Sequence, residues 1–283
     1  MNFQKKTWMG LALVLGLGLS ACKVEEVRAP LARGFVHLTL GNPSNAQANT
    51  AFSSNFLIVR DQYALSYHRD RGTANWVAWQ LDKTWLGSVP RQDDFRADGV
   101  LPASWFRAAG NSYSGSGFDR GHLCPSADRD QTIADNSATF FMTNIIPQAP
   151  DNNQGPWADL ENYCRSLVNT GQNELYIWAG GYGQGGVGSI GFANEVANGQ
   201  ITVPARTWKV IVVLPKGEED LERIQASTRV IAVDMPNTQG ILNTAWRDFR
   251  VSIDAIEMVT GLDFLADLPN SLENAIESRI DNQ

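Results

Sequence analysis

The run Asp119-Arg120-Gly121-His122 stands directly before Leu123-Cys124-Pro125 in a chain of 283 residues. A residue that precedes proline is biased toward extended backbone, so Cys124 and the run before it are expected to be extended. In a strand, His122 and Cys124 would face one side, and Asp119 and Gly121 the other side or the turn. The run therefore predicts a short strand that carries a base, a carboxylate and a guanidinium.

A helix is predicted downstream of this strand, at 157–167. Its apolar residues recur every three or four positions, as in a buried stripe: Leu160, Tyr163, Cys164 and Leu167. Glu161 and Arg165 share another face, and Asn153 lies just before the helix. A second strand that includes about residues 140–146, followed by this helix, would bring His122 and Asn153 together.

Other runs are rich in β-branched and aromatic residues and are bounded by turn formers, which is typical of strands. They are residues 55–60, 63–67, 76–81, 138–146, 174–179, 207–214 and 229–234. A second helix is indicated near the C-terminus, where Asn270 and Glu273 have the spacing of a capping box. Because strands and helices do not alternate regularly, the sequence predicts an α+β fold with a largely antiparallel central sheet flanked by helices.

His122, Asn153 and Glu161 together suit metal-assisted cleavage of a phosphodiester. The charge of a phosphodiester repels nucleophiles, so a site must activate water and neutralise charge on the phosphate. His122 is the candidate general base, because imidazole has an ordinary pKa of about 6.5. Asn153 is the candidate Mg²⁺ ligand, since Mg²⁺ keeps several waters and takes other oxygens from the substrate. Glu161 would orient a water on the metal.

Arginines are the candidates for holding the phosphate. Every basic residue between positions 91 and 165 is an arginine, and the planar guanidinium binds phosphate oxygens in pairs. Arg91, Arg120 and Arg165 are assigned this role, and Asp119 is expected to fix a neighbouring backbone group or an arginine. The formal charge of −7 has the wrong sign for a broad nucleic-acid-binding surface, so weak, salt-sensitive binding is expected.

The first 21 residues are typical of an export signal. Lys5-Lys6 precede an apolar run at 11–19 that is too short to span a membrane. Leu19-Ser20-Ala21-Cys22 resembles the lipobox of bacterial lipoproteins, in which Cys22 becomes the lipidated first residue. An exported outer-membrane or cell-surface lipoprotein is therefore expected; the alternative is a periplasmic or secreted protein. Residues 22–34 would form a tether and 35–283 the folded domain, and removing residues 1–21 lowers the formal charge from −7 to −9.

A glycine-rich run, Gly183-Gln184-Gly185-Gly186-Val187-Gly188, matches the G-x-G-x-x-G pattern of dinucleotide-binding folds. That motif requires glycines that open a helix and an acidic residue about twenty positions later. Residues 189–200 contain further turn formers and lead into another strand, and no acid lies near Trp208. The run is therefore interpreted as a mobile surface loop.

A longer pattern surrounds the histidine. The runs at 117–129 (GFDRGHLCPSADR) and 142–148 (MTNIIPQ), with Asn152-Asn153, Trp157 and Leu160-Glu161 after them, resemble the DNA/RNA non-specific endonucleases. This ββα-metal family includes the Serratia-type secreted nuclease, mitochondrial endonuclease G and a secreted cyanobacterial member. The resemblance extends from about Phe35 to the C-terminus and includes 55–81 and Arg91-Gln92-Asp93.

The resemblance implies a ββα-metal motif at the active site and Mg²⁺, with Mn²⁺ as an alternative. It implies cleavage of single- or double-stranded DNA and RNA without strong sequence preference, leaving 5′-phosphates. Contacts to phosphate and sugar carry no sequence information, which agrees with that breadth. By the same resemblance the base is His122, the metal ligand Asn153, the water-orienting acid Glu161, and the phosphate-binding arginines Arg91 and Arg165. Within the Asp-Arg-Gly-His run, Asp119 and Arg120 are expected to support His122.

Cys124 departs from the family pattern, in which a small residue is expected. Cys124 and Cys164 are the thiols that remain if Cys22 carries lipid, and export would permit a bridge between them. A disulfide that closes a loop of about 40 residues would stabilise the fold by roughly 4 kcal/mol. The alternative is two buried free thiols.

Two other functions remain open from the residues alone. One is an exported metal-dependent phosphodiesterase that acts on a substrate other than nucleic acid, such as a lipid headgroup. The other is a non-catalytic lipoprotein that binds polyanions. DNA and RNA are the expected partners, together with a membrane if Cys22 is lipidated. The chain is expected to act as a monomer, and the sequence does not indicate whether a protein inhibitor exists.

Overall fold

The computed structural model describes residues 33–283; the predicted export signal, Cys22 and the predicted tether up to residue 32 lie outside the described residues. The described part begins with a 3-10 helix, Arg33–Leu38. None of the helices in this part is long and apolar enough to cross a membrane.

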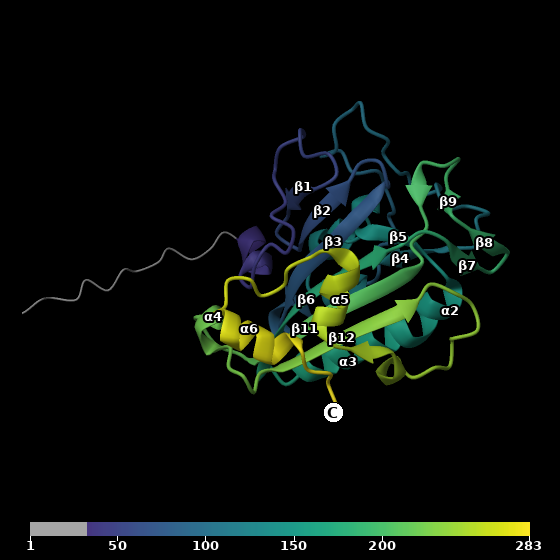
Figure 1. Ribbon diagram of the computed structural model, residues 1–283. Helices are drawn as coiled ribbons and strands as arrows, with labels where there is room; N and C mark the ends of the chain where they lie inside the picture. The colour runs from purple at the N-terminus through teal and green to yellow at the C-terminus, as the bar shows by residue number, and fades with distance from the viewer. Residues whose placement is uncertain (1–32) are drawn as a thin grey trace, which may run out of the picture. The chain divides into compact units, whose positions relative to one another are not determined.

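A seven-stranded antiparallel sheet forms the centre of the part that the structure describes (Figure 1). Its strands, in spatial order, are β1 (Phe56–Val59), β2 (Ala64–His68), β3 (Thr73–Leu81), β6 (Asn173–Tyr182), β11 (Arg206–Pro215), β12 (Arg229–Pro236) and β13 (Arg250–Val251). Six of the predicted strands fall on β1, β2, β3, β6, β11 and β12. The predicted α+β class with a largely antiparallel sheet is confirmed.

Both faces of this sheet are buried, and alternate residues of each strand enter different cores. Ile177 of β6 and Ile211 of β11 belong to one core, whereas Trp178 and Val210 belong to the other. This alternation is the two-residue period of an extended chain. Since neither face meets water, the central strands are almost continuously apolar in sequence.

Helices cover the two faces. Helix α3 (Ala158–Val168) buries Leu160, Cys164 and Val168 in the first core. Helices α5 (Ile253–Thr260) and α6 (Asn270–Glu277) bury Ile253, Ile256 and Ile276 in the second, and they are drawn in yellow over that face of the sheet in Figure 1. The shorter helices are α1 (Ile133–Ala138), α2 (Pro150–Asn152) and α4 (Asp220–Arg223).

A strand–strand–helix unit lies beside the main sheet. Strand β4 (Asp119–His122) pairs antiparallel with β5 (Ile145–Gln148), so that Asp119 lies opposite Gln148 and His122 opposite Ile145. The chain then continues through α2 and a π-helical turn, Asn153–Trp157, into α3. The expected ββα arrangement is present, and the predicted helix at 157–167 corresponds to α3.

The predicted strand at 138–146 is wrong. Helix α1 ends at Ala138, a 3-10 turn occupies Met142–Asn144, and β5 begins only at Ile145. The side chain of Asn144 explains the difference, because its Nδ2 donates to the carbonyls of Cys124 (2.8 Å) and Thr139 (2.9 Å). Its Oδ1 accepts from the Cys124 N–H (2.9 Å), so a side chain satisfies backbone groups that a strand ladder would otherwise use.

The glycine-rich run is not a free surface loop. Strand β7 (Gly186–Gly188) ends the run and forms a hairpin with β8 (Gly191–Ala193). A second small pair of strands, β9 (Glu195–Val196) and β10 (Ile201–Thr202), follows. The Val187 N–H donates to the carbonyl of Asn237 (3.0 Å), which fixes the run to the chain after β12.

The predicted capping box at the C-terminal helix is also wrong. Helix α6 is capped by Pro269, which makes no side-chain hydrogen bond, and Asn270 is already inside the helix. The N–H of Glu273 donates to the backbone carbonyl of Pro269 (3.1 Å) rather than to an Asn270 side chain.

Cys124 and Cys164 are free thiols in this structure, so the bridge is not formed and the alternative of two buried thiols describes the fold. Both side chains are packed in the core between the sheet and α3, where they act as small apolar groups. Burial raises the pKa of each thiol to about 12, which keeps both protonated and unreactive.

Candidate active site

An open cleft of about 870 Å³ lies at β4, and four of the candidate residues line it: Arg91, Asp119, Arg120 and Asn153. The other walls come from the chain before β4, including Phe95 and Tyr113. The sequence separates Arg91 from Asn153 by the whole of β4 and β5, and the ββα unit brings them to one surface.

Gly121 allows β4 to approach β5 at the bottom of this unit. A Cβ at this position would lie 2.2 Å from Oε1 and 2.6 Å from Cβ of Gln148. Gln148 is fully buried and its Nε2 donates to Oδ1 of Asn152 (2.8 Å), so its side chain has no room to move away. The glycine of the Asp-Arg-Gly-His run is therefore required by packing.

Asp119 orients the amide of Asn153. Its Oδ2 accepts from Nδ2 of Asn153 (2.9 Å) and from Nε2 of Gln154 (2.8 Å). The expectation that Asp119 fixes a backbone group or an arginine is wrong, because both of its partners are side-chain amides of the π-helical turn. With the amide nitrogen held in this way, the carbonyl oxygen of Asn153 accepts from no donor among residues 33–283 and is free to bind a cation.

His122 lies at the end of β4, between two aromatic rings. Its ring centre is 5.4 Å from that of Phe95 and 4.9 Å from that of Phe140. The residue is 8% exposed, and its Nε2 has no hydrogen-bond partner within the described residues. Burial, followed by the charges of Arg91 and Arg120, lowers the pKa of His122 to about 3. The imidazole is therefore neutral at pH 7.

Two guanidiniums stand at the cleft wall. Nη1 of Arg91 donates to Oγ of Ser126 (2.8 Å), and its Nε pairs with Asp93 (2.7 Å). The guanidinium of Arg120 lies 3.8 Å from the ring centre of Phe95 and donates to the carbonyl of Gly110 (3.0 Å). Each arginine has a partner that fixes it while its charge stays open to the cleft.

Glu161 lies on α3 and is paired with a buried lysine. Nζ of Lys209 is 3.1 Å from Oε1 of Glu161, and the lysine side chain is 1% exposed. The same ammonium lies 3.9 Å from the ring centre of Trp157, whose Nε1 donates to the backbone carbonyl of His122 (3.2 Å). Burial raises the pKa of Glu161, and the charge of Lys209 opposes that shift.

Arg165 is committed to a second buried carboxylate. Its Nη1 donates to Oδ1 of Asp128 (2.8 Å), and Asp128 also accepts from Nε1 of Trp79 (3.0 Å). As expected, Glu161 and Arg165 share a face of α3, but neither lines the cleft that holds Asn153. The structure thus brings four candidate residues to one cleft and places Glu161 and Arg165 farther along the helix.

Sequence reasoning missed several residues that contact the candidates, namely Lys209, Asp128, Gln154, Phe95 and Phe140. Lys209 carries a readable signal, since it is the lone charge in the apolar run 207–214 and a lysine buried in a strand requires a partner. The two phenylalanines carry no such signal, because an aromatic residue is ordinarily part of a core.

Several known proteins are similar to this chain in sequence or in fold. The sequence profile of the DNA/RNA non-specific endonucleases matches residues 40–271. A nuclease of a Nostoc species is 49% identical over 278 residues, which cover 97% of this chain and 98% of that protein. Human mitochondrial endonuclease G is 34% identical over 223 residues, 76% of this chain and 70% of that protein. A chain of the solved EndoG/EndoGI complex has the same fold, with a TM-score of 0.70 at 22% identity over 86% of this chain and 96% of that one. The chain therefore belongs to the DNA/RNA non-specific endonuclease family.

Proposed function

We propose that this endonuclease hydrolyses phosphodiester bonds of single- and double-stranded DNA and RNA at the cleft beside β4, without strong sequence preference, and leaves 5′-phosphates. The observation that supports this best is the Asp119–Asn153 hydrogen bond, which presents an amide oxygen in the cleft that Arg91 and Arg120 also line. His122 ends β4, the strand on which Asp119 and Arg120 lie. Membership of the family supports the substrate class.

The residues at the cleft fit a hard divalent cation. Asn153 presents a free amide oxygen, which is a ligand type that Mg²⁺ accepts while it keeps several waters. We propose that Asn153 holds Mg²⁺, with Mn²⁺ as an alternative. When bound, the ion would lower the pKa of water and offset the negative charge of the phosphate.

His122 is proposed to take the proton of the attacking water. As the water oxygen bonds to phosphorus, the bond from phosphorus to the 3′ oxygen breaks, and the leaving oxygen takes a proton from solvent. Arg91 and Arg120 hold the phosphate through their guanidinium groups. Glu161, fixed by Lys209, orients water, and Arg165, fixed by Asp128, contacts phosphate on the α3 side.

Digestion of plasmid DNA and of RNA in Mg²⁺ tests the proposal. A chelator, His122→Ala and Asn153→Ala are each expected to abolish cleavage, since a general base contributes about 10²–10⁴-fold in rate. His68→Ala is the matched control, because His68 lies on β2 and does not line the cleft. Full activity of the His122 variant would refute the assignment of the base. Cleavage of a lipid-headgroup phosphodiester with nucleic acid left intact would favour the other substrate class.

We also propose that the protein is exported and anchored to a membrane through lipid on Cys22. The sequence Leu19-Ser20-Ala21-Cys22 supports this, although these residues lie outside the described part. Labelled fatty acid should enter the wild-type protein but not Cys22→Ser. Equal labelling of both would contradict the proposal, and release of an unlabelled wild-type protein into the medium would favour free secretion.

A further inference from the structure

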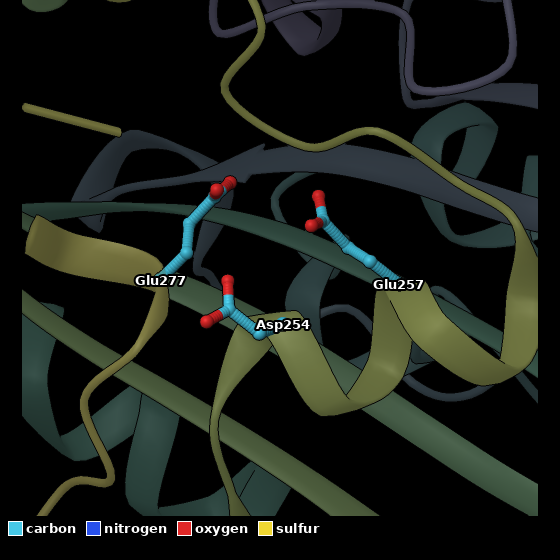
Figure 2. A group of neighbouring side chains, drawn as sticks. All are labelled: Asp254, Glu257 and Glu277. Carbon is cyan, nitrogen blue, oxygen red and sulfur yellow. The ribbon is translucent and has the colours of Figure 1, made fainter. Parts of the chain in front are cut away.

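Three carboxylates converge where α5 meets α6, and the proposed catalytic mechanism does not use them. Asp254 and Glu257 lie one turn apart on α5, and Glu277 is the last residue of α6. One oxygen from each of the three lies within 4.8 Å of the other two. Figure 2 shows the side chains extending from the two helices into one shared space.

Glu277 is the buried member of this group. It is 3% exposed, and its Oε1 has no hydrogen-bond partner within residues 33–283. A buried carboxylate oxygen without a partner destabilises the fold, because it has lost its hydrogen bonds to water and forms none within the protein. This unpartnered oxygen belongs to a carboxyl group that lies beside two others, which points to a ligand that can bind all three.

The charges around Glu277 are unbalanced. Burial raises the pKa of Glu277 to about 8, and Glu257, Glu273, Asp254 and Asp263 act in the same direction. Glu257 is held in place, since its Oε1 accepts from the Phe264 N–H (2.6 Å) and its carboxylate cannot simply turn away. Both helices pack onto the same core, through Ile256 and Ile276, and this packing maintains the repulsion.

We propose that Asp254, Glu257 and Glu277 bind one divalent cation, and that calcium is the cation that fits them best. Calcium takes six to eight oxygen ligands in flexible geometry, including carboxylates that bind through both oxygens. Magnesium requires a stricter octahedron and gives up its waters reluctantly, so it suits this set less well. Asp254 is exposed, which gives an ion and its remaining waters a route from solvent.

The cation would tie the C-terminal helix to α5, on the face of the sheet opposite α3. Its effect would be on stability, since α5 and α6 contribute Ile253, Ile256 and Ile276 to the second core. The site shares no residue with the cleft at Asn153, so the proposal does not depend on the catalytic assignments.

Calcium titration of the full-length Asn153→Ala protein tests the proposal, because this variant lacks the proposed catalytic metal ligand. Calorimetry is expected to show one calcium ion bound per chain. Calcium at about 100 times its Kd is expected to raise Tm by roughly 5–10 °C. Magnesium at the same concentration is expected to raise Tm less.

Glu277→Gln in the same background is expected to remove both the calorimetric binding and the calcium-dependent rise in Tm. Without calcium it should be at least as stable as its parent, because the amide keeps the size of the side chain and relieves repulsion. Asp254→Asn, at an exposed position, should give the same loss if Glu277→Gln does not fold. Glu222→Gln, an exposed glutamate on α4, is the matched control and should bind calcium as the parent does. No calcium binding in the parent, or an unchanged Tm rise in the Glu277 and Asp254 variants, would overturn the proposal.

Discussion

Nζ of Lys209 lies 3.1 Å from Oε1 of Glu161, and this ion pair joins β11 of the central sheet to α3 of the ββα unit. The lysine is 1% exposed, whereas the glutamate is 15% exposed. Through Trp157, which contacts the ammonium and donates to the carbonyl of His122, the same lysine is connected to β4. The pair thus links the sheet to the strand and the helix that carry the candidate residues.

Lys209→Met is expected to lower the free energy of unfolding by about 3 kcal/mol, because it leaves Glu161 largely buried without its counter-charge. Urea unfolding at pH 7 measures this loss. Lys83→Met is the matched control, since Lys83 is exposed and bonds only Asn169. The double variant Lys209→Met with Glu161→Gln should recover most of the stability but no nuclease activity. A double variant that is as unstable as Lys209→Met would show that the packing of the lysine matters, not its charge.

Asp119→Asn is expected to raise the Mg²⁺ concentration for half-maximal cleavage by about 10-fold, as is typical when a group that orients a metal ligand is changed. An asparagine at position 119 can donate as well as accept, so it no longer forces Asn153 to turn its amide nitrogen toward β4 and its oxygen toward the cation. The rate at saturating Mg²⁺ should change much less. Activity measured across a Mg²⁺ series separates the two effects.

Asp94→Asn is the control for that series, because Asp94 lines the same cleft but bonds Arg96 and Ser137. It changes the charge of the cleft by the same amount as Asp119→Asn. If both variants shift the Mg²⁺ dependence equally, Asp119 acts through charge alone and does not orient Asn153.

Arg120→Ala is expected to raise KM for DNA with a smaller effect on kcat, because Arg120 lies at the exposed wall of the cleft and would contact phosphate in both the ground state and the transition state. Arg247→Ala, at an exposed arginine outside the cleft, serves as the control and should behave as wild type. A fall in kcat at unchanged KM would instead assign Arg120 to the transition state alone.

The strands of the central sheet could be predicted because each is marked by its own run of apolar residues in the sequence. Strands β11 and β12 are buried on both faces, so their apolar runs stand out, and the predicted bounds 207–214 and 229–234 differ from the observed ones by at most two residues. The run 138–146 looks equally strand-like, but it is divided among a helix end, a turn and β5, since the Asn144 side chain bonds two backbone segments. That division depends on Cys124, twenty positions earlier, which no local pattern reveals.

The candidate site, too, could be predicted only where it does not depend on contacts between distant parts of the sequence. The Asp-Arg-Gly-His run, Asn153 and the arginines could be named from residue type and family resemblance, and four of them line one cleft. The surroundings of His122 could not be named, because Phe95 comes from the chain before β4 and Phe140 from the segment between β4 and β5, and both meet its ring only in the folded chain. Their packing supplies the burial that lowers the pKa of the imidazole.

Acid should destabilise the metal-free protein through its buried histidines. His37 and His122 each have a pKa lowered to about 3 in the folded state, mainly by burial, against an ordinary value of 6.5. His37 must also be neutral to accept from the Gln80 N–H at Nδ1 (3.0 Å). Between pH 6.5 and pH 3 the unfolded chain binds these two protons and the folded chain does not, so the free energy of unfolding falls as pH falls.

Each of these histidines contributes up to about 1.4 kcal/mol per pH unit in that window. Glu277 works in the opposite direction, because its pKa is raised to about 8 and its stabilising contribution is lost as pH rises. The difference in the free energy of unfolding between the wild type and His122→Ala does not include the contributions of Glu277 and His37, because both proteins contain these residues. Urea unfolding at pH 6, 5 and 4 in a chelator should therefore give a difference between the two proteins that changes by about 1.4 kcal/mol per pH unit. A constant difference across this range would mean that His122 titrates near its ordinary pKa, and that the two aromatic rings do not exclude water from it.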